Sequence, residues 1–137
     1  MTMLRALSIQ QPWAWLIAHG HKDIENRTWP LSYRGRLVIH AGKAQAAQQL
    51  DDHEGICIRF PEIAKIIPPL REMEFGGIVG IANLVDCLTE SRSPWFRGPF
   101  GFLLKEAQPV QFVPFPGRLQ LFPVNASLVR TLKQEAS

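Results

Sequence analysis

The first third of the chain alternates between short apolar runs and breaks made of polar residues or glycine. Apolar and β-branched content predicts strands over Leu4–Ile9, Lys22–Trp29 and Arg36–Ala41. Between the first two strands, apolar side chains recur at helical spacing from Pro12 to His19. Gly20 then offers the left-handed conformation that ends a helix. A short helix is therefore predicted after the first strand.

Alternation is strictest between Arg36 and Ala41, where the order is Arg, Leu, Val, Ile, His, Ala. Side chains of a strand point alternately to its two faces. This period of two places Leu37, Ile39 and Ala41 on one face of the strand. His40 is expected on the opposite face, which it shares with Arg36.

The middle of the chain, residues 44–75, has the composition of helices. Ala, Gln and Leu dominate Ala44–His53, which indicates a helix interrupted by Gly55. Pro61 suits the first turn of a second short helix, which must end before Pro68. This stretch is predicted to be a helical insertion between two groups of strands.

β-Branched and aromatic residues return after Gly77, separated by proline and glycine. Four more strands are predicted over Ile78–Val85, Phe100–Leu104, Val110–Phe115 and Leu119–Val124. Asn125 is suited to cap a terminal helix that carries Leu128, Val129 and Leu132. Six or seven short strands without regular strand–helix alternation predict a mainly β domain of the α+β class. Its architecture is expected to be a small β-barrel, closed or partly open, with flanking helices.

The composition is that of one folded domain over residues 1–137. Hydrophobic residues make up 46% and charged residues 20% of the chain, which excludes a disordered or collagen-like protein. The longest smooth apolar stretch, Ile78–Val85, is far shorter than the roughly 20 residues that a membrane span needs. Gln10 and Gln11 interrupt the apolar core that a signal peptide would require. We therefore expect a cytoplasmic protein without a membrane segment.

Cysteine and histidine residues do not form a metal-binding pattern. Cys57 and Cys87 lack the paired spacing of a zinc site and are expected as reduced, buried thiols. His19 and His21 have no cysteine or carboxylate at matching spacing. We expect neither a metal ion nor another cofactor.

Positive charge is concentrated at the start of the chain. Residues 1–43 hold six basic and two acidic side chains, a net charge of +4, in a protein whose total is +3. The same segment holds three of the four tryptophans. Cations attract phosphates and flat aromatic rings stack on bases, so the combination favours a nucleic-acid ligand. Solvated cations around tryptophans of the core would produce the same pattern.

The densest group of chemically active side chains runs from Gly20 to Arg27, in the order Gly-His-Lys-Asp-Ile-Glu-Asn-Arg. Glu25 and Arg27 share one face of the predicted strand, whereas Lys22 falls on the other. The three share a cleft only if Lys22 lies in the turn before the strand or the backbone bulges. The alternative is a surface ion cluster.

If these side chains converge, two kinds of chemistry follow. Glu25 and Arg27 would form an ion pair that orients a ligand. Lys22 would contact a phosphate or act as a catalytic amine. The neighbouring glutamate favours the charged lysine, which opposes the lowered pKa that a general base needs.

Several stretches together resemble a known family. In the first 43 residues they are Leu7–Ala14, Gly20–Arg27 as G-x-K-x-x-E-x-R, Arg34-Gly35 and Ile39–Ala41. These stretches resemble the ASCH domains, which are relatives of the PUA-like β-barrels. Later in the chain, residues 77–80, 84–86 and 98–101 also look like strands of that family. The resemblance spans most of the chain and is weak over residues 44–75. It implies a PUA-like barrel with a cleft that recognises RNA or a nucleoside.

The resemblance also implies roles for single residues. Lys22 matches the cleft lysine of the family, Glu25 the following polar position, and Arg27 the arginine that closes the motif. Some small members resemble acetylcytidine amidohydrolases, in which this lysine, a threonine at the next motif position and a glutamate from a later strand hydrolyse an acetyl amide. Here Glu25 replaces the threonine, and Asp86 and Glu90 are the candidates for the later carboxylate. Other members are similar to RNA-binding or RNA-cleaving proteins.

Three further residues are candidates for the same cleft. Trp15 is expected to stack on a base, His40 to hydrogen-bond to a base or phosphate, and Lys43 to contact a phosphate. Their alternative roles are, in the same order, a core aromatic residue, a satisfied polar residue and a solvated lysine.

The sequence thus predicts an ASCH-type domain that recognises RNA or a modified nucleoside in a basic cleft. The residues expected in this cleft are Lys22, Glu25, Arg27, Trp15, His40 and Lys43. One alternative is an amidohydrolase acting on an acylated pyrimidine nucleoside such as acetylcytidine, with Lys22 and Glu25 as its catalytic residues. Another is an RNA-cleaving enzyme. No protein partner follows from the sequence.

Overall fold

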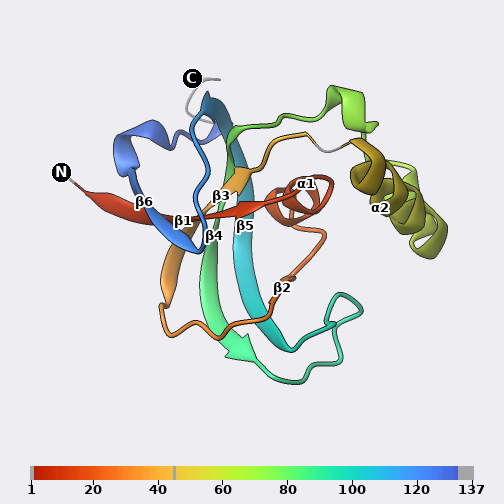
Figure 1. Cartoon of the computed structure of the whole chain (residues 1–137), viewed down its shortest axis with the longest axis horizontal. Coiled ribbons are helices and arrows are strands. Elements are labelled where there is room, and N and C mark those ends of the chain that lie inside the picture. The colour runs from red at the N-terminus through yellow and green to blue at the C-terminus, as the bar shows by residue number, and fades with distance from the viewer. Residues whose placement is uncertain (1, 45, 133–137) are drawn as a thin grey trace.

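Six strands form one mixed sheet. A computed structural model of the chain describes residues 2–44 and 46–132 (Figure 1). The strands are β1 (Met3–Ile9), β2 (Ile24–Arg27), β3 (Gly35–Ala41), β4 (Gly77–Leu88), β5 (Phe100–Pro114) and β6 (Leu121–Asn125). They are hydrogen-bonded in the order β2-β5-β4-β3-β1-β6. β1 and β3 run parallel, and the other neighbouring pairs are antiparallel.

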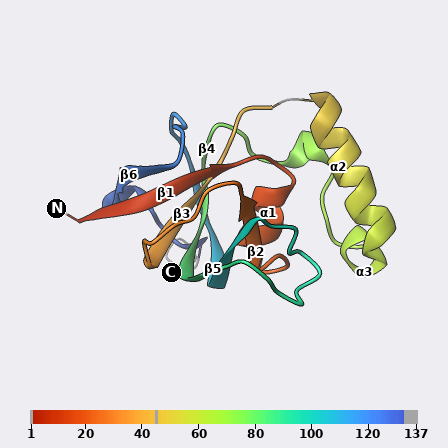
Figure 2. The same cartoon turned by 60° about the horizontal axis from the view of Figure 1, so that its bottom comes forward.

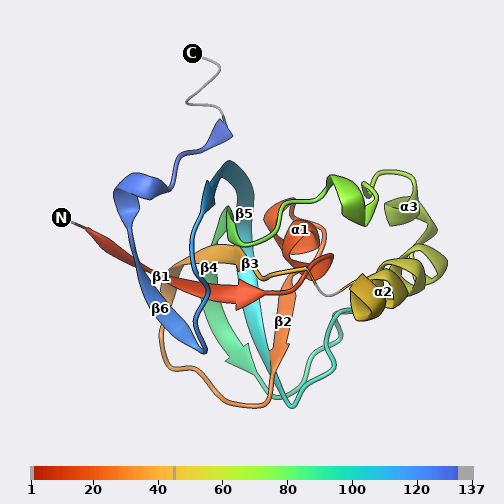
Figure 3. The same cartoon turned by 45° about the horizontal axis from the view of Figure 1, so that its top comes forward.

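The helices are grouped at one end of the sheet. α1 (Trp13–Ala18) follows β1, while three elements come between β3 and β4, namely α2 (Ala46–Arg59), α3 (Pro61–Ala64) and the 3₁₀ turn η1 (Leu70–Glu72). A second 3₁₀ turn, η2 (Ala126–Leu128), follows β6. In Figures 2 and 3, α2 and α3 lie beyond α1, on the side away from β6. The predicted helix after the first strand and the helical insertion are both confirmed.

α1 packs on one face of the sheet and closes the main core. A Cβ atom on Gly80 would lie 2.6 Å from the Cβ of Ala18, so only glycine at this point of β4 lets the helix approach so closely. The buried side chains of this cluster are Leu7, Ile9, Ala14, Ile17, Leu37, Ile39, Ala41, Val79, Ala82, Leu84, Phe102 and Leu104. Their removal from water is the main stabilising contribution to this arrangement.

Two further clusters stabilise the rest of the molecule. Val38 points to the opposite face of β3 and packs there with Ala6, Ile78, Ile81, Val110, Phe122 and Val124. The alternation predicted over Arg36–Ala41 is therefore confirmed for its apolar residues. The third cluster joins α1 to α2 and to the segment before β5, and its buried members are Leu16, Ile24, Ile56, Ile67, Met73 and Trp95.

The sheet does not close into a barrel. β2 and β6 stand at the two ends of the strand order, and across the described residues they are not hydrogen-bonded to each other. β2 has only four residues, and among the described strands it pairs only with β5. A side chain bridges β2 to β1 instead of a backbone ladder, since Nη2 of Arg27 donates to the carbonyl of Ser8 over 2.8 Å. The predicted α+β class is confirmed, whereas the closed form of the barrel is wrong.

Two predicted strands form a single long one. β5 runs from Phe100 to Pro114, although the sequence predicts separate strands on either side of Pro109. Pro109 pairs with Gly80 between two register shifts of the β4–β5 ladder. A proline lacks the N–H that a regular ladder needs, so an irregular stretch of the ladder accommodates it without ending the strand.

α2 continues through Gly55 to Arg59, beyond the end predicted at His53. A glycine inside a helix costs only about 1 kcal/mol relative to alanine. Burial of Ile56 in the third cluster exceeds that cost, since a fully buried isoleucine contributes about 1.5–3 kcal/mol. The extension matters because it brings the end of α2 to the site described below.

Directly after Asn125, where the sequence predicts the start of a terminal helix, the structure has only the short 3₁₀ turn Ala126–Leu128. Asn125 does act as a cap, because its Oδ1 accepts from the N–H of Ser127 over 2.9 Å. The turn nevertheless ends at Leu128, and Thr131 then forms an isolated bridge with Val110. Residues 133–137 lie outside the described part of the chain.

Cys57 and Cys87 are both unpaired, as predicted, but they are half-buried rather than fully buried. In the described ranges, 2–44 and 46–132, no helix combines the length and the apolar character that crossing a membrane requires.

Candidate functional site

Lys22 lies in the turn between α1 and β2. Its backbone N–H donates to the carbonyl of Leu16 over 3.1 Å, and β2 begins two residues later at Ile24. Because Lys22 precedes the strand, its side chain is not bound by the alternation of β2. Nζ lies 3.4 Å from Oε1 of Glu25 and also donates to the carbonyl of Ile24. The first of the two conditions for a shared cleft is met.

Glu25 is clamped between two cations. Its Oε1 faces Lys22, and its Oε2 accepts from Nε of Arg27 over 3.0 Å and lies 2.9 Å from Nη2 of the same guanidinium. The side chain of Glu25 is 11% exposed, and that of Arg27 is 23% exposed. Arg27 also bonds to the carbonyl of Ser8, so its guanidinium is largely occupied with holding Glu25 and β1. The three motif residues form one ordered charge network.

Lys22 is an unusual lysine because only 4% of its side chain is exposed. Burial lowers the pKa of Lys22 below its ordinary value of 10.5, and the charge of Glu25 opposes this shift only in part. Nζ also lies 5.5 Å from the ring centre of Trp13. The ammonium therefore loses its proton more readily than a lysine on the surface does.

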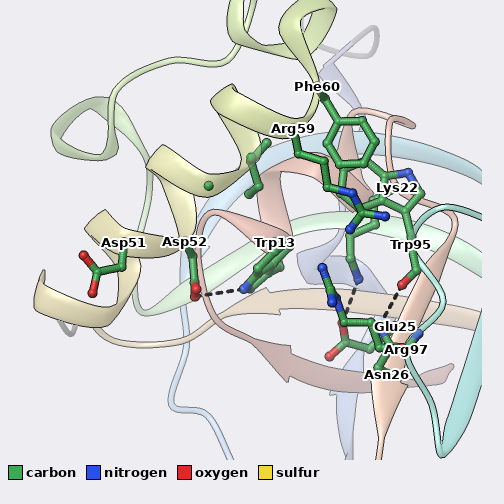
Figure 4. A pocket seen from close by; sticks show the side chains of 12 residues that line it. Trp13, Lys22, Glu25, Asn26, Asp51, Asp52, Arg59, Phe60, Trp95 and Arg97 are labelled. Carbon is green, nitrogen blue, oxygen red and sulfur yellow. Dashed lines mark hydrogen bonds and ion pairs between the residues drawn. The ribbon is translucent and has the colours of Figure 1, made fainter.

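Lys22 and Glu25 line a cavity of about 430 Å³, the Lys22 cavity, which Figure 4 shows from close by. Aromatic side chains from three parts of the chain face it: Trp13 of α1, Phe60 after α2, and Trp95 of the segment before β5. Phe60 and Trp95 stack on each other with ring centres 4.3 Å apart. A concave, mostly apolar space with a few fixed polar groups is typical of a small-molecule site.

Asn26 fixes the wall of the Lys22 cavity that Trp95 belongs to. Its Nδ2 donates to the carbonyl of Trp95 over 2.9 Å. Its Oδ1 accepts from the backbone N–H groups of Arg97 and Gly98, over 2.8 and 3.1 Å. One amide thus uses both ends to bind the backbone of residues 95–98, which otherwise belongs to no helix or strand.

Charges of both signs surround this cavity. Asp51 and Asp52 lie on α2 about two turns before Arg59, and Arg97 comes from the segment before β5. Asp52 accepts a hydrogen bond from Nε1 of Trp13 over 3.2 Å, which orients the indole. The carboxylates of Asp51 and Asp52 therefore provide acceptors at one end of α2. The guanidinium groups of Arg59 and Arg97 can bind an anionic group of a ligand.

A second cavity, the groove, continues from the first. It measures about 810 Å³ and shares with the Lys22 cavity the lining residues Trp13, Glu25 and Asn26. Its other lining residues are Ser8, Ile9, Gln10, Arg27, Gly42, Lys43, Gly117, Arg118, Leu119 and Gln120. Lys43, exposed two residues after β3, lines the groove with Arg27 and does not line the Lys22 cavity.

Trp15 does not face Lys22. It lines a separate cavity of about 560 Å³, the Trp15 cavity, together with residues such as His19 and Glu74. Its indole stacks on His19 with ring centres 4.4 Å apart and on His21 at 5.4 Å. Positions two apart in a helix project about 200° from each other, so Trp13, and not Trp15, turns toward the lysine.

His40 is buried and does not reach the cleft as a free ligand. Its Nδ1 lies 3.0 Å from Oγ of Ser8, and its Nε2 lies 2.6 Å from the carbonyl oxygen of Phe115. Since a carbonyl only accepts, Nε2 carries a proton and donates to Phe115. Arg36 on the same face is exposed, so the shared face does not bring the two residues into one environment. His40 therefore fits its alternative role, that of a buried polar residue whose hydrogen bonds are formed within the protein.

Sequence reasoning missed most of the cavity lining. Trp13 takes the place expected for Trp15, because the start and phase of the helix decide which indole turns toward Lys22. Asn26 could have been identified from the sequence, because it is the polar residue between Glu25 and Arg27 in the motif. The other missed lining residues are Asp51, Asp52, Gly55, Ile56, Arg59, Phe60, Trp95 and Arg97. They come from distant segments that only the fold brings together.

Neither candidate for the later carboxylate lines the Lys22 cavity. Asp86 forms an exposed ion pair with Arg34 at 3.6 Å, and Glu90 lies exposed after β4. The carboxylates that accompany Glu25 at the cavity come instead from α2, at Asp51 and Asp52.

Comparison with known proteins identifies the family. The family model of the ASCH domain matches residues 7–108. The chain belongs to the ASCH domain family. The stretch matched contains Lys22, Glu25 and Arg27 as well as Trp95 and Arg97, so both walls of the Lys22 cavity fall within the domain.

Curated relatives and solved structures agree with this assignment. The chain is 30% identical over 126 residues to human activating signal cointegrator 1 and 32% identical over 94 residues to the mouse protein. These matches cover 80% and 63% of this chain but only 20% and 15% of those proteins. The chain thus spans about one fifth of the length of the human relative.

The solved structures show the same fold at low sequence identity. The ASCH protein of Zymomonas mobilis superposes with a TM-score of 0.54 at 17% identity, covering 93% of this chain and 96% of that protein. A variant of the same bacterial protein superposes with a TM-score of 0.56 at 16% identity, covering 91% and 97%.

Proposed function

We propose that this ASCH domain recognises a base of RNA, or a modified nucleoside, in the Lys22 cavity. The observation that carries the proposal is that aromatic rings, Trp13 and Trp95, share one cavity with the buried pair Lys22–Glu25. Recognition of an unstacked base needs a flat apolar surface for its ring and fixed polar groups for its edge. The cavity supplies both.

Some polar groups hydrogen-bond to the ligand, and others keep those groups in position. An ionised carboxylate has about four acceptor positions, and Lys22 and Arg27 occupy only part of those of Glu25. Glu25 accepts from an exocyclic amine of the base, and Lys22 donates to a ring carbonyl. Arg27 positions Glu25, because its own donors already face Glu25 and the carbonyl of Ser8.

The test is a titration of the full chain with a labelled single-stranded RNA of mixed sequence. We expect binding that weakens as salt rises, because phosphate contacts release counterions. Lys22→Met is expected to weaken binding, and Lys65→Met is the matched control because the Lys65 side chain, directly after α3, is 71% exposed. Folded protein that binds no RNA and no nucleoside at low ionic strength contradicts the proposal. Shortened RNA after the titration would indicate the RNA-cleaving alternative.

The buried lysine favours a second function, hydrolysis of an acylated pyrimidine nucleoside such as acetylcytidine. Burial lowers the pKa of Lys22, which gives the amine the capacity to take a proton from water. The resulting hydroxide adds to the acetyl carbonyl, the C–N bond breaks, and the same proton passes to the departing amino group, leaving cytidine and acetic acid, which releases its proton to water as acetate. Glu25 keeps the amine in place at 3.4 Å.

Mass spectrometry of acetylcytidine incubated with the protein tests this second function. Lys22→Ala must stay folded and lose turnover. Lys22→Arg separates the two functions, because a guanidinium keeps its charge but cannot act as a base. RNA binding that survives in Lys22→Arg while deacetylation disappears supports catalysis by the amine. Turnover that persists in Lys22→Ala excludes it.

A further inference from the structure

The groove continues the Lys22 cavity toward the carboxyl ends of two strands. β1 and β3 run parallel with Ile9 opposite Ala41, so the residues that follow them, Gln10 and Gly42, lie side by side at one edge of the sheet. The N–H of Gly42 donates to the carbonyl of Ile9 over 3.0 Å, which holds this edge together. The space is larger than the Lys22 cavity, about 810 Å³ against 430 Å³. The groove therefore offers space beyond that proposed for a single base over Lys22.

The charges that line the groove are almost all positive. Lys43 and Arg118 are exposed, and they form no ion pair with any residue in the described ranges. Glu25 is the one carboxylate among the described lining residues, and its charge is already balanced by Lys22 and Arg27. The two unpaired cations therefore leave the groove electropositive, which suits phosphates.

Arg118 is carried by a loop that His40 holds in place. Nε2 of His40 donates to the carbonyl of Phe115 over 2.6 Å, at the start of the loop between β5 and β6. A Cβ atom on Gly117 would lie 2.9 Å from Cε1 of His40 and 3.2 Å from Oγ of Ser8. The backbone before Arg118 thus packs directly on a buried ring that is itself bonded to β1. This cation is presented from an anchored loop, which lowers the entropy cost of binding.

We infer that the groove binds the sugar–phosphate backbone next to a base held in the Lys22 cavity, with Lys43 and Arg118 on its phosphates. The ligand is then a base within single-stranded RNA rather than a free nucleoside. This inference rests on the proposed function, because it requires a base over Lys22. His40 is a positioning residue for the loop that carries Arg118.

The experiment compares two kinds of probe on the full chain: free nucleosides, including acetylcytidine, and a single-stranded RNA hexamer of mixed sequence. The variants are Lys43→Glu and Arg118→Glu. Arg5→Glu and Lys105→Glu make the same change of charge at exposed positions of β1 and β5 that line neither cavity. Circular dichroism confirms that each variant is folded.

The inference expects the hexamer to bind more tightly than any nucleoside. Each groove variant should weaken hexamer binding on the order of tenfold at 50 mM salt, and should reduce the slope of log affinity against log salt by about 0.7. Nucleoside binding and the two control variants should change little. Hexamer affinity equal to that of a nucleoside, or groove variants no weaker than the controls, overturns the inference while leaving the Lys22 cavity as a nucleoside site. Absence of binding to both kinds of probe overturns the proposed function as well.

Discussion

Trp13 and Trp15 lie two residues apart on α1 and face different chemical surroundings. Trp13 lines both the Lys22 cavity and the groove, donates to Asp52, and lies 5.5 Å from the ammonium of Lys22. Trp15 lies in the Trp15 cavity and stacks on His19 and His21. The same residue type on the same short helix therefore serves two unrelated environments.

The two environments differ most in charge. The residues that line the Lys22 cavity and the groove together include six basic side chains and three carboxylates, an excess of positive charge. The Trp15 cavity holds Glu72 and Glu74 instead, and burial raises the pKa of Glu74. A phosphate-bearing ligand is attracted to the first and repelled by the second. Helix phase, rather than proximity to a motif in the sequence, therefore decides which tryptophan can contact a ligand.

The largest expected effect comes from the two amides that hold the cavity walls. Asn26→Ala removes three hydrogen bonds to the backbone of residues 95–98, and should lower the free energy of unfolding by about 2–4 kcal/mol. Gln11→Ala removes two bonds at the Trp15 cavity, to the carbonyl of Glu74 and the N–H of Trp15, and should cost about 1–3 kcal/mol. Urea unfolding measures both.

RNA titration of the same two variants tests whether the two cavities differ in function. Asn26→Ala should also lose RNA affinity, because Trp95 and Arg97 are no longer held in place. Gln11→Ala should keep its affinity under conditions where it is folded. Equal losses of affinity in both variants would mean that the two cavities do not differ in function.

The next effect concerns the two tryptophans themselves. Trp13→Leu should weaken binding of single-stranded RNA about fivefold to 150-fold, because stacking on one base contributes about 1–3 kcal/mol. Trp15→Leu should change affinity little, since Trp15 does not line the Lys22 cavity or the groove. Fluorescence anisotropy with matched fractions of folded protein gives the two affinities. A larger loss for Trp15→Leu would reverse the assignment of the two cavities.

A smaller effect is the pH dependence of stability that Lys22 causes. Because the folded pKa of Lys22 is lowered, the unfolded chain binds a proton that the folded chain lacks between that pKa and 10.5. Stability of the natural protein should therefore rise with pH in this interval relative to Lys22→Met. Unfolding curves of both proteins at several pH values measure the difference. Lys65→Met, at a side chain that is 71% exposed, is the control for the change from lysine to methionine itself.

The smallest effect belongs to the Trp15 cavity. Burial, and to a lesser degree the charge of His21, lowers the pKa of His19 below 6.5. Protonation is then harder in the folded than in the unfolded chain, so stability should fall as pH decreases from 6.5 through the folded pKa. His19→Gln should remove this part of the decline. NMR titration of the His19 ring checks the direction of the shift, and a pKa above 6.5 would contradict it.

Much of the fold was accessible from local patterns. The period of two over Arg36–Ala41 and the helical spacing after Pro12 both reflect which side chains must leave water, and the structure confirms them. Pro109 misled the prediction because proline breaks only a regular ladder, and β4 and β5 are shifted in register around it. Gly55 misled it because packing of Ile56 outweighs the cost of a glycine in α2.

The candidate site was accessible only in part. Lys22, Glu25 and Arg27 lie within six residues, so their joint presence could be read directly, although their convergence depended on Lys22 preceding β2. Asp52 and Trp95 could not be found in this way, because neither lies in a pattern that sets it apart from ordinary surface and core residues. They reach the cavity through α2 and through the backbone that Asn26 binds.

The sequence by itself determined the elements and the identity of the charged motif, because apolar periodicity and residue type are local properties. Tertiary structure alone decided which aromatic rings surround that motif and that the groove leads away from it. Tertiary structure also decided how readily Lys22 loses its proton. In water, a lysine next to a glutamate would keep its proton. Burial of its side chain to 4% exposure lowers the pKa of Lys22 despite that neighbour. Desolvation depends on everything that packs around a group, and that is set only when distant segments come together.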